Sequence, residues 1–213
     1  MKKKLTVKEI LESKGKKKLT QVYVHTPLEA NACEQSGIDM IVSSENNNFK
    51  FLRESAMNTF FTVGLQFGRY LSEYEIVKRS FQLLETGADA IYCPQSSRFI
   101  KAIANEGIPV VGHAGFIPYK ATHYGGFKAY GKNLNEAKKI LKQIHTLQDA
   151  GAFATEIEIV PEEIIEIFYK KTDIFLIGMG SGTICDAQYL FSEDILGYNS
   201  NHIPRHAKTY GNL

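Results

Sequence analysis

The sequence feature that most limits the fold is a unit that recurs along the chain: a helical segment that ends at or near a glycine, followed at once by a short apolar strand. The unit occurs at residues 29–44, 77–93, 100–113 and 140–160. Glycine is favoured after a last helical turn because it enters the left-handed region without steric cost. Because a short apolar run after such a helix is typical of a buried parallel strand, the pattern predicts a parallel sheet covered by helices.

Counting along the chain gives eight strands, near residues 19–24, 39–43, 60–65, 90–93, 109–112, 154–159, 174–177 and 195–198. Most of the gaps between them carry a helical pattern, and Ser72 with Glu75 forms a capping box at the start of one. Eight β/α units predict a compact TIM (β/α)8 barrel of the α/β class, with residues 1–213 as a single domain. A doubly wound open sheet is the alternative, and the absence of a GxGxxG motif makes it weaker.

The composition excludes several other classes of protein. No apolar run reaches the roughly 18 residues that span a bilayer, and the lysine-rich N-terminal segment lacks the apolar core of a secretory signal. The lysines build no basic stripe, so we expect neither a nucleic-acid nor a membrane partner. Cys33, Cys93 and Cys185 are far apart and form no CxxC motif. This favours a reducing compartment, and we expect a cytoplasmic protein.

Catalytic residues of a TIM barrel lie at the carboxyl ends of its strands. In the segment ATEIEIVP, residues 154–161, Glu156 and Glu158 alternate with Ile157 and Ile159. Because residues two apart in a strand share a face, both carboxylates face the barrel interior together or not at all. If they face inward, Glu158 is nearer the catalytic rim and could act as an acid or base. A structural ion pair with a nearby lysine is an equally weighted alternative.

Other strand ends supply further candidates, each with a simpler structural explanation. His113 follows a buried strand between two glycines, which allow a ligand close to the backbone, although a lone histidine there is more often structural. The turn GMGSG, from Gly178 to Gly182, could present N–H groups to an anion, but glycine-rich turns are common. The loop GGFK at residues 125–128 could be a lid or a plain turn. Glu45 could bind a hard cation or be an ordinary loop carboxylate.

Several motifs occur in an order that resembles one known family. They are GHAGFIP at 112–118, GGFKAYGK at 125–132, DAGAFATEIEIVP at 149–161, IGMGSG at 177–182, CDAQ at 185–188, ILGY at 195–198 and IPRHAKTY at 203–210. Together they resemble the ketopantoate hydroxymethyltransferase (3-methyl-2-oxobutanoate hydroxymethyltransferase) family of the phosphoenolpyruvate mutase/isocitrate lyase superfamily. The likeness covers nearly the whole chain and is strongest from Val110 to Tyr210.

The resemblance implies a homo-oligomeric TIM-barrel enzyme that binds Mg²⁺. It would transfer a one-carbon unit from 5,10-methylenetetrahydrofolate to a small 2-oxo acid, 2-oxoisovalerate, in pantothenate biosynthesis. The metal would hold the oxo acid and stabilise the enolate formed when C3 loses a proton. The family acid/base glutamate corresponds to Glu158, and the family histidine after strand five corresponds to His113.

The sequence departs from the family pattern at the metal and carboxylate positions. Ser44, Glu45 and Asn46 replace a family Gly-Asp-Ser, in which the aspartate binds the metal and the serine helps to hold the substrate carboxylate. Gly64 replaces the second metal ligand, an aspartate, and Tyr92 replaces a lysine that meets the substrate carboxylate. We therefore expect Glu45 as the remaining metal candidate. The expected substrate contacts are Ser44, Asn46, Tyr92, Gly178 and Gly180.

Three functional hypotheses follow. The first is a divergent hydroxymethyltransferase-like enzyme that performs aldol-type chemistry on a small 2-oxo acid with Glu158 as acid/base. The second is a different reaction of the superfamily, such as a C–C lyase or a metal-independent reaction. The third is a non-catalytic paralogue that binds a ligand. Dependence on Mg²⁺, activity in EDTA, or ligand binding without turnover would distinguish them.

Overall fold

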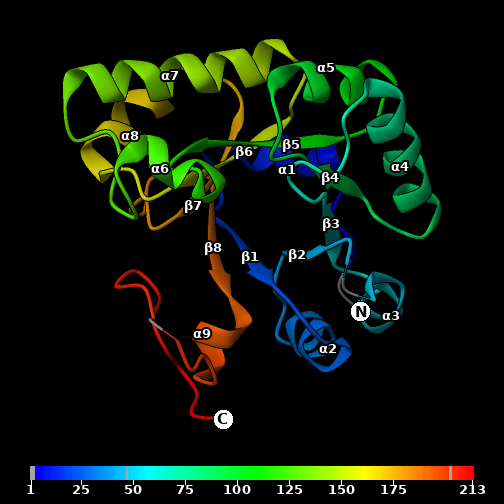
Figure 1. The fold of residues 1–213 in the computed structure, drawn as a ribbon. Helices are drawn as coiled ribbons and strands as arrows, with labels where there is room; N and C mark the ends of the chain where they lie inside the picture. The colour runs from blue at the N-terminus through cyan, green and yellow to red at the C-terminus, as the bar shows by residue number, and fades with distance from the viewer. Residues whose placement is uncertain (1–2, 47, 202) are drawn as a thin grey trace.

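The computed structural model describes residues 3–46, 48–201 and 203–213, and its centre is a closed barrel of eight parallel strands in sequence order (Figure 1). The strands are β1 (Leu19–Tyr23), β2 (Met40–Ser44), β3 (Phe60–Gly64), β4 (Ala90–Tyr92), β5 (Val110–Gly115), β6 (Ala154–Glu158), β7 (Phe175–Met179) and β8 (Ala187–Phe191). The barrel closes where β8 pairs with β1, from Leu19 opposite Ala187 to Tyr23 opposite Phe191. The predicted TIM barrel is therefore confirmed.

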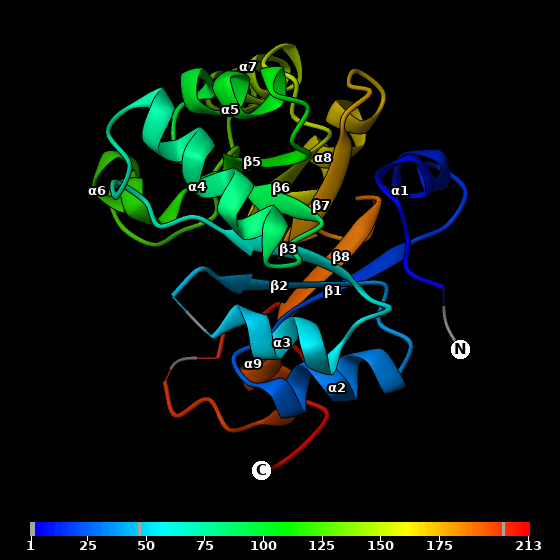
Figure 2. The same ribbon diagram turned by 90° about the vertical axis from the view of Figure 1, so that its right-hand side faces the viewer.

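Helices surround this barrel on several sides (Figure 2). They are α1 (Val7–Ser13), α2 (Pro27–Gln35), α3 (Phe49–Ser55), α4 (Glu73–Glu85), α5 (Ser97–Asn105), α6 (Ala121–Tyr124), α7 (Leu134–Asp149), α8 (Glu162–Tyr169) and α9 (Ser192–Leu196), with a 3₁₀ turn η1 (Pro118–Lys120). The predicted capping box of α4 is present, with Ser72 and Glu75 each bonded to the other's backbone N–H. None of the described helices is long and apolar enough to cross a membrane.

One predicted strand was wrong. Residues 195–198 were expected to form the eighth strand, but they cover the end of α9, the left-handed Gly197 and the residue after it. The eighth strand is instead Ala187–Phe191, which contains the polar Gln188 and does not read as an apolar run. The strand forms because its backbone pairs with both β7 and β1, which is a tertiary effect that overrides the local pattern.

The buried side chains form two layers separated by the barrel wall. The inner layer fills the barrel with residues such as Met40, Phe60 and Phe175, and the outer layer packs strand residues such as Ile41 against the helices. Because neighbouring strand residues alternate between the two layers, each strand sends every second side chain into the barrel. This alternation decides which side chains can reach the interior at the carboxyl ends of the strands.

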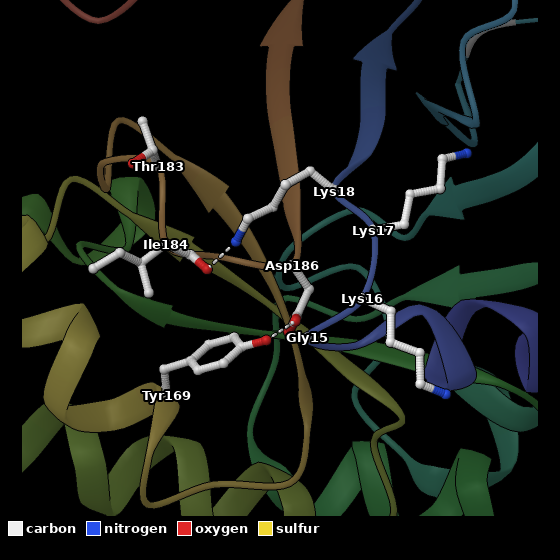
Figure 3. Close-up of a pocket in the computed structure, with 8 residues that line it drawn as sticks. All are labelled: Gly15, Lys16, Lys17, Lys18, Tyr169, Thr183, Ile184 and Asp186. Atoms are coloured by element: carbon white, nitrogen blue, oxygen red, sulfur yellow. Dashed lines mark hydrogen bonds between the residues drawn. The ribbon is translucent and has the colours of Figure 1, made fainter.

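The opposite, amino end of the barrel is held by a buried carboxylate, Asp186 (Figure 3). Its side chain is fully buried and accepts hydrogen bonds from Lys14 Nζ at 3.0 Å, Tyr169 Oη at 2.7 Å and the backbone N–H of Leu176 at 2.9 Å. The residue thereby connects the segment after α1, the end of α8 and the start of β7. A surface pocket beside it is lined by Lys16, Lys17 and Lys18, among others.

Candidate active site

A cavity of about 530 Å³ lies at the carboxyl ends of the strands. Its lining residues come from all parts of the barrel: Tyr23, His25, Val42, Ser43, Ser44, Asn46, Gly64, Leu65, Gln66, Tyr92, His113, Pro118, Tyr119, Glu156, Glu158, Met179, Tyr189, Phe191 and Glu193. The structure thus brings five predicted site residues together in one cavity: Ser44, Asn46, Tyr92, His113 and Glu158.

Strand β6 supplies two carboxylates to this cavity. Glu156 and Glu158 face the barrel interior with 4% and 6% of their surface exposed, whereas Ile157 between them is fully buried in the outer layer. The strand ends at Glu158 because Ile159 adopts a left-handed conformation with a φ of 50°. A β-branched residue in that region is strained by about 1–3 kcal/mol, and such strain is concentrated at functional sites. The alternation in the sequence therefore puts both glutamates in the barrel.

His113 lies between these two glutamates. Its Nε2 is 3.2 Å from Glu158 Oε2 and 2.8 Å from the carbonyl oxygen of Phe116. Its Nδ1 is 2.8 Å from Tyr92 Oη and 3.6 Å from Glu156 Oε2. The four side chains of Tyr92, His113, Glu156 and Glu158 form one buried polar group, which we call the Glu–His–Glu array. Among the described residues, the charged partner of Glu158 is His113 and not a lysine as in the alternative prediction.

The two carboxylates control the charge of the histidine. Burial alone would lower the pKa of His113, but its hydrogen bonds and charge interactions with Glu156 and Glu158 outweigh this and raise the pKa to about 10. Burial raises the pKa of Glu156, although His113 acts in the opposite direction. Burial and the nearby Glu156 carboxylate raise the pKa of Tyr92 well above its usual value. Since an imidazolium carries a proton on both nitrogens, Nδ1 donates to the Tyr92 oxygen. The Tyr92 hydroxyl proton is then left to donate elsewhere.

The raised pKa of His113 predicts that the protein loses stability as the pH rises. The pKa of His113 is about 10 in the folded protein against 6.5 for an unperturbed histidine, so its contribution to stability is complete below about pH 6.5 and is lost towards pH 10. We expect the free energy of unfolding to fall by up to about 1.4 kcal/mol per pH unit between pH 7 and pH 9. Urea unfolding at several pH values measures this slope. The variant His113→Gln should remove most of it, and an unchanged slope in that variant would contradict the assignment.

Glu45, the predicted metal ligand, lies outside the cavity lining. Its Oε1 accepts from the Gln66 N–H at 2.9 Å, and its Oε2 accepts from Tyr70 Oη at 2.5 Å and from Arg79 Nε at 2.8 Å. These bonds hold the pKa of the Glu45 carboxyl below its usual value against the effect of burial. Both carboxylate oxygens are therefore engaged within the protein.

The residues at this strand edge do not fit a Mg²⁺ ion. A hard divalent cation needs several oxygen ligands, yet Glu45 is bound to Arg79 and Gly64 carries no side chain. Within residues 3–46, 48–201 and 203–213, no group of three or more His, Cys, Asp or Glu side chains is arranged to hold a metal. The protein's own side chains are therefore the groups available for chemistry in the cavity.

The glycines at the end of β7 and in the turn after it serve packing: Gly178 lies within β7, and Gly180 lies in the turn. Gly178 and Gly180 do not line the cavity. A side chain at Gly178 would contact Cys185, and one at Gly180 would lie 2.6 Å from the His206 ring. The Ser181 hydroxyl in the same turn accepts from the Val160 N–H and donates to the Ile157 carbonyl. The contact of Gly178 and Gly180 with the substrate stays a prediction. The turn holds the end of β6 through the hydrogen bonds of Ser181.

Sequence reasoning missed several residues of the cavity. Glu156 shares the inward face of β6 with Glu158, so the same alternation could have placed it in the site. Tyr189, Phe191 and Glu193 were missed because the eighth strand was assigned to the wrong segment. Gln21 does not line the cavity, but its Nε2 lies 3.4 Å from Glu156 Oε1, and the sequence carries no signal for this contact beyond the position of Gln21 in β1.

The fold and the site define a class: a parallel β/α barrel with a buried group of glutamate and histidine side chains at the carboxyl ends of its strands. Residues 46–213 match the model of the ketopantoate hydroxymethyltransferase family. The chain belongs to that family.

Curated relatives agree with this assignment. The 3-methyl-2-oxobutanoate hydroxymethyltransferase of Kosmotoga olearia is 30% identical to this chain, and the alignment covers 98% of this chain and 87% of the relative. The corresponding protein of Pyrococcus furiosus is 31% identical, with 98% and 82% covered.

Solved structures share the fold at low sequence identity. The 2,3-dimethylmalate lyase, a member of the PEP mutase/isocitrate lyase superfamily, has a TM-score of 0.63 and 12% identity over 91% of this chain and 84% of its own. The carboxyl transferase domain of Rhizobium etli pyruvate carboxylase has a TM-score of 0.65 and 11% identity over 88% of this chain and 42% of that one. At these identities the likeness supports the fold.

Proposed function

We propose that the chain is a hydroxymethyltransferase-like enzyme that moves a proton on the carbon next to a carbonyl group, with Glu158 as the acid/base. The observation that carries the proposal is the position of Glu158, which lines the cavity and has Oε2 3.2 Å from His113 Nε2. A carboxylate that is held in a fixed position at a cavity wall can reach a proton of a substrate bound there and can return it.

The Glu–His–Glu array supplies the remaining parts of this chemistry. Glu158 takes the proton from the substrate carbon, and the electron pair of the broken C–H bond moves to the carbonyl oxygen to give an enolate. The His113 imidazolium and the Tyr92 hydroxyl, which His113 leaves free to donate, stabilise that negative charge. The enolate carbon then forms a C–C bond to a one-carbon unit at the oxidation level of formaldehyde, and the oxygen of that unit takes a proton to become the hydroxyl group of the product. The donor that the family resemblance implies is 5,10-methylenetetrahydrofolate, which gives up this unit by reaction with water and is released as tetrahydrofolate.

Proton exchange tests the first half of the reaction without a one-carbon donor. In D₂O the protein should exchange the C3 proton of a 3-methyl-2-oxobutanoyl compound, and NMR follows the loss of the proton signal. Because the residues do not fit Mg²⁺, the exchange rate should be the same with EDTA as with added Mg²⁺. Exchange that requires Mg²⁺ would show that a metal supplies the Lewis acid after all. Absence of exchange with both the acid and its uncharged amide would contradict the proposed function.

Two substrate classes are compatible with this proton transfer. The name 3-methyl-2-oxobutanoate hydroxymethyltransferase, carried by the relatives, indicates a 2-oxo acid. A carbonyl compound without a carboxylate would undergo the same enolisation. The charges around the cavity bear on this choice.

A further inference from the structure

We infer that the cavity at the barrel mouth takes an uncharged carbonyl compound in preference to a 2-oxo acid. The inference rests on the proposed function for the reaction, but its evidence is separate, because it comes from the charges and donors that surround the cavity. A 2-oxo acid would bring a carboxylate that needs cationic side chains or free N–H groups to replace its water.

The side chains that line the cavity are acidic. The described lining residues include the three glutamates Glu156, Glu158 and Glu193, two histidines, and neither lysine nor arginine. Carboxylates of the protein would therefore face a substrate carboxylate at short range, in a site where burial weakens screening by solvent. An uncharged carbonyl group meets no such repulsion.

Both histidines of the cavity lining are held by carboxylates of the protein. His25 Nε2 lies 2.5 Å from Glu193 Oε2, and His113 lies between Glu156 and Glu158. Arg79 does not line the cavity, and its guanidinium is already paired with the Glu45 carboxylate. A substrate carboxylate would have to compete with these fixed internal partners.

The backbone donors at the ends of β2 and β3 are also occupied. The Ser44 N–H donates to Tyr23 Oη, the Asn46 N–H to Ser44 Oγ, and the Gln66 N–H to Glu45 Oε1. Such N–H groups are the usual alternative to a lysine or arginine for holding a carboxylate. Ser44 and Asn46 were predicted to contact the substrate, but their backbone N–H groups are hydrogen-bonded within the protein.

Aromatic rings form much of the remaining wall. Phe191 stacks on Tyr23 with ring centroids 5.1 Å apart and on Tyr189 at 5.3 Å. These surfaces favour an apolar substrate body. In the part of the chain that the structure describes, Arg69 is an exposed cation beside the cavity, and its Nη1 donates to the side-chain oxygens of Asn46 and Gln66 at 3.2 Å each. It is therefore included as a variant in the test.

A matched pair of ligands tests the inference. 2-Oxoisovalerate and 3-methyl-2-oxobutanamide have the same carbon skeleton and the same ketone, and they differ in the charge of one group. Binding to the wild-type protein is measured by saturation-transfer NMR titration at constant ionic strength, and C3 exchange in D₂O is measured on the same samples. We expect the amide to bind to the wild-type protein at least about tenfold more tightly than the acid. Each of the variants Tyr92→Lys and Gln66→Arg adds a cation to the cavity wall and should shift the preference towards the acid.

Each outcome separates the inference from the proposed function. Tighter binding of the amide without exchange would support the inference and contradict the proposed proton transfer. Equal or tighter binding of 2-oxoisovalerate with exchange would overturn the inference and leave the proton transfer in place, and loss of that binding in Arg69→Ala would identify Arg69 as the carboxylate partner. Failure of both ligands to bind would also overturn the inference.

Discussion

Replacing Glu158 with Gln should lower the rate of C–H exchange by about a hundred- to ten-thousand-fold, the usual range for loss of a general base. Gln keeps the size of the side chain and an oxygen that His113 can bind, but its amide cannot accept the proton. The rate is measured by NMR in D₂O on a substrate that the wild-type protein exchanges. Retention of more than a tenth of the wild-type rate in Glu158→Gln would remove Glu158 from the role of base.

Glu156→Gln is the matched control, because it makes the same chemical change two residues earlier on the same face of β6. Glu156 contributes to the raised pKa of His113, so its loss should lower that pKa from about 10 and move the alkaline limb of the rate profile to lower pH. At neutral pH the exchange rate should fall much less than in Glu158→Gln. Equal losses in both variants, with no shift in the profile, would mean that the two carboxylates act as one structural pair.

Periodicity explains why part of the site was predictable. The alternation in β6 places Glu158 and Glu156 on one face. Glycine-ended helices located four of the eight strands, and short apolar runs located three more. β8 was missed because its partners β1 and β7, rather than its own pattern, make it a strand. A local pattern reports which face a side chain takes, and it reports nothing about which distant strand will pair with it.

The partners of a polar side chain are beyond such a pattern. Glu45 was expected at a metal because it follows β2, but its partners Tyr70 and Arg79 lie 25 and 34 residues further along the chain. Likewise, the charge of His113 depends on Tyr92 and on two residues of β6, which come together only when the barrel closes. The sequence showed the residue types and their positions at strand ends, whereas the charge state of each group depends on contacts that exist only in the closed barrel.

Replacing Asp186 with Asn should lower the free energy of unfolding by about 3 kcal/mol, because it removes one partner of a buried charge pair and leaves Lys14 without its carboxylate. The Asn side chain also cannot accept from Lys14, Tyr169 and the Leu176 N–H as an ionised carboxylate does. Urea unfolding measures the loss. Asp173→Asn, an exposed aspartate in the turn before β7, is the matched control and should change stability by less than about 0.5 kcal/mol.

A double-mutant cycle with Lys14→Met separates the charge pair from the other bonds of Asp186. If the unpaired lysine causes much of the cost, the double variant should be more stable than Asp186→Asn alone, giving a coupling energy of about 1 kcal/mol or more. Asp186 lies at the amino end of the barrel and Glu158 at the carboxyl end, so the exchange rate per folded molecule should stay unchanged in Asp186→Asn. A parallel loss of exchange would mean that the amino end of the barrel also controls the geometry of the Glu–His–Glu array.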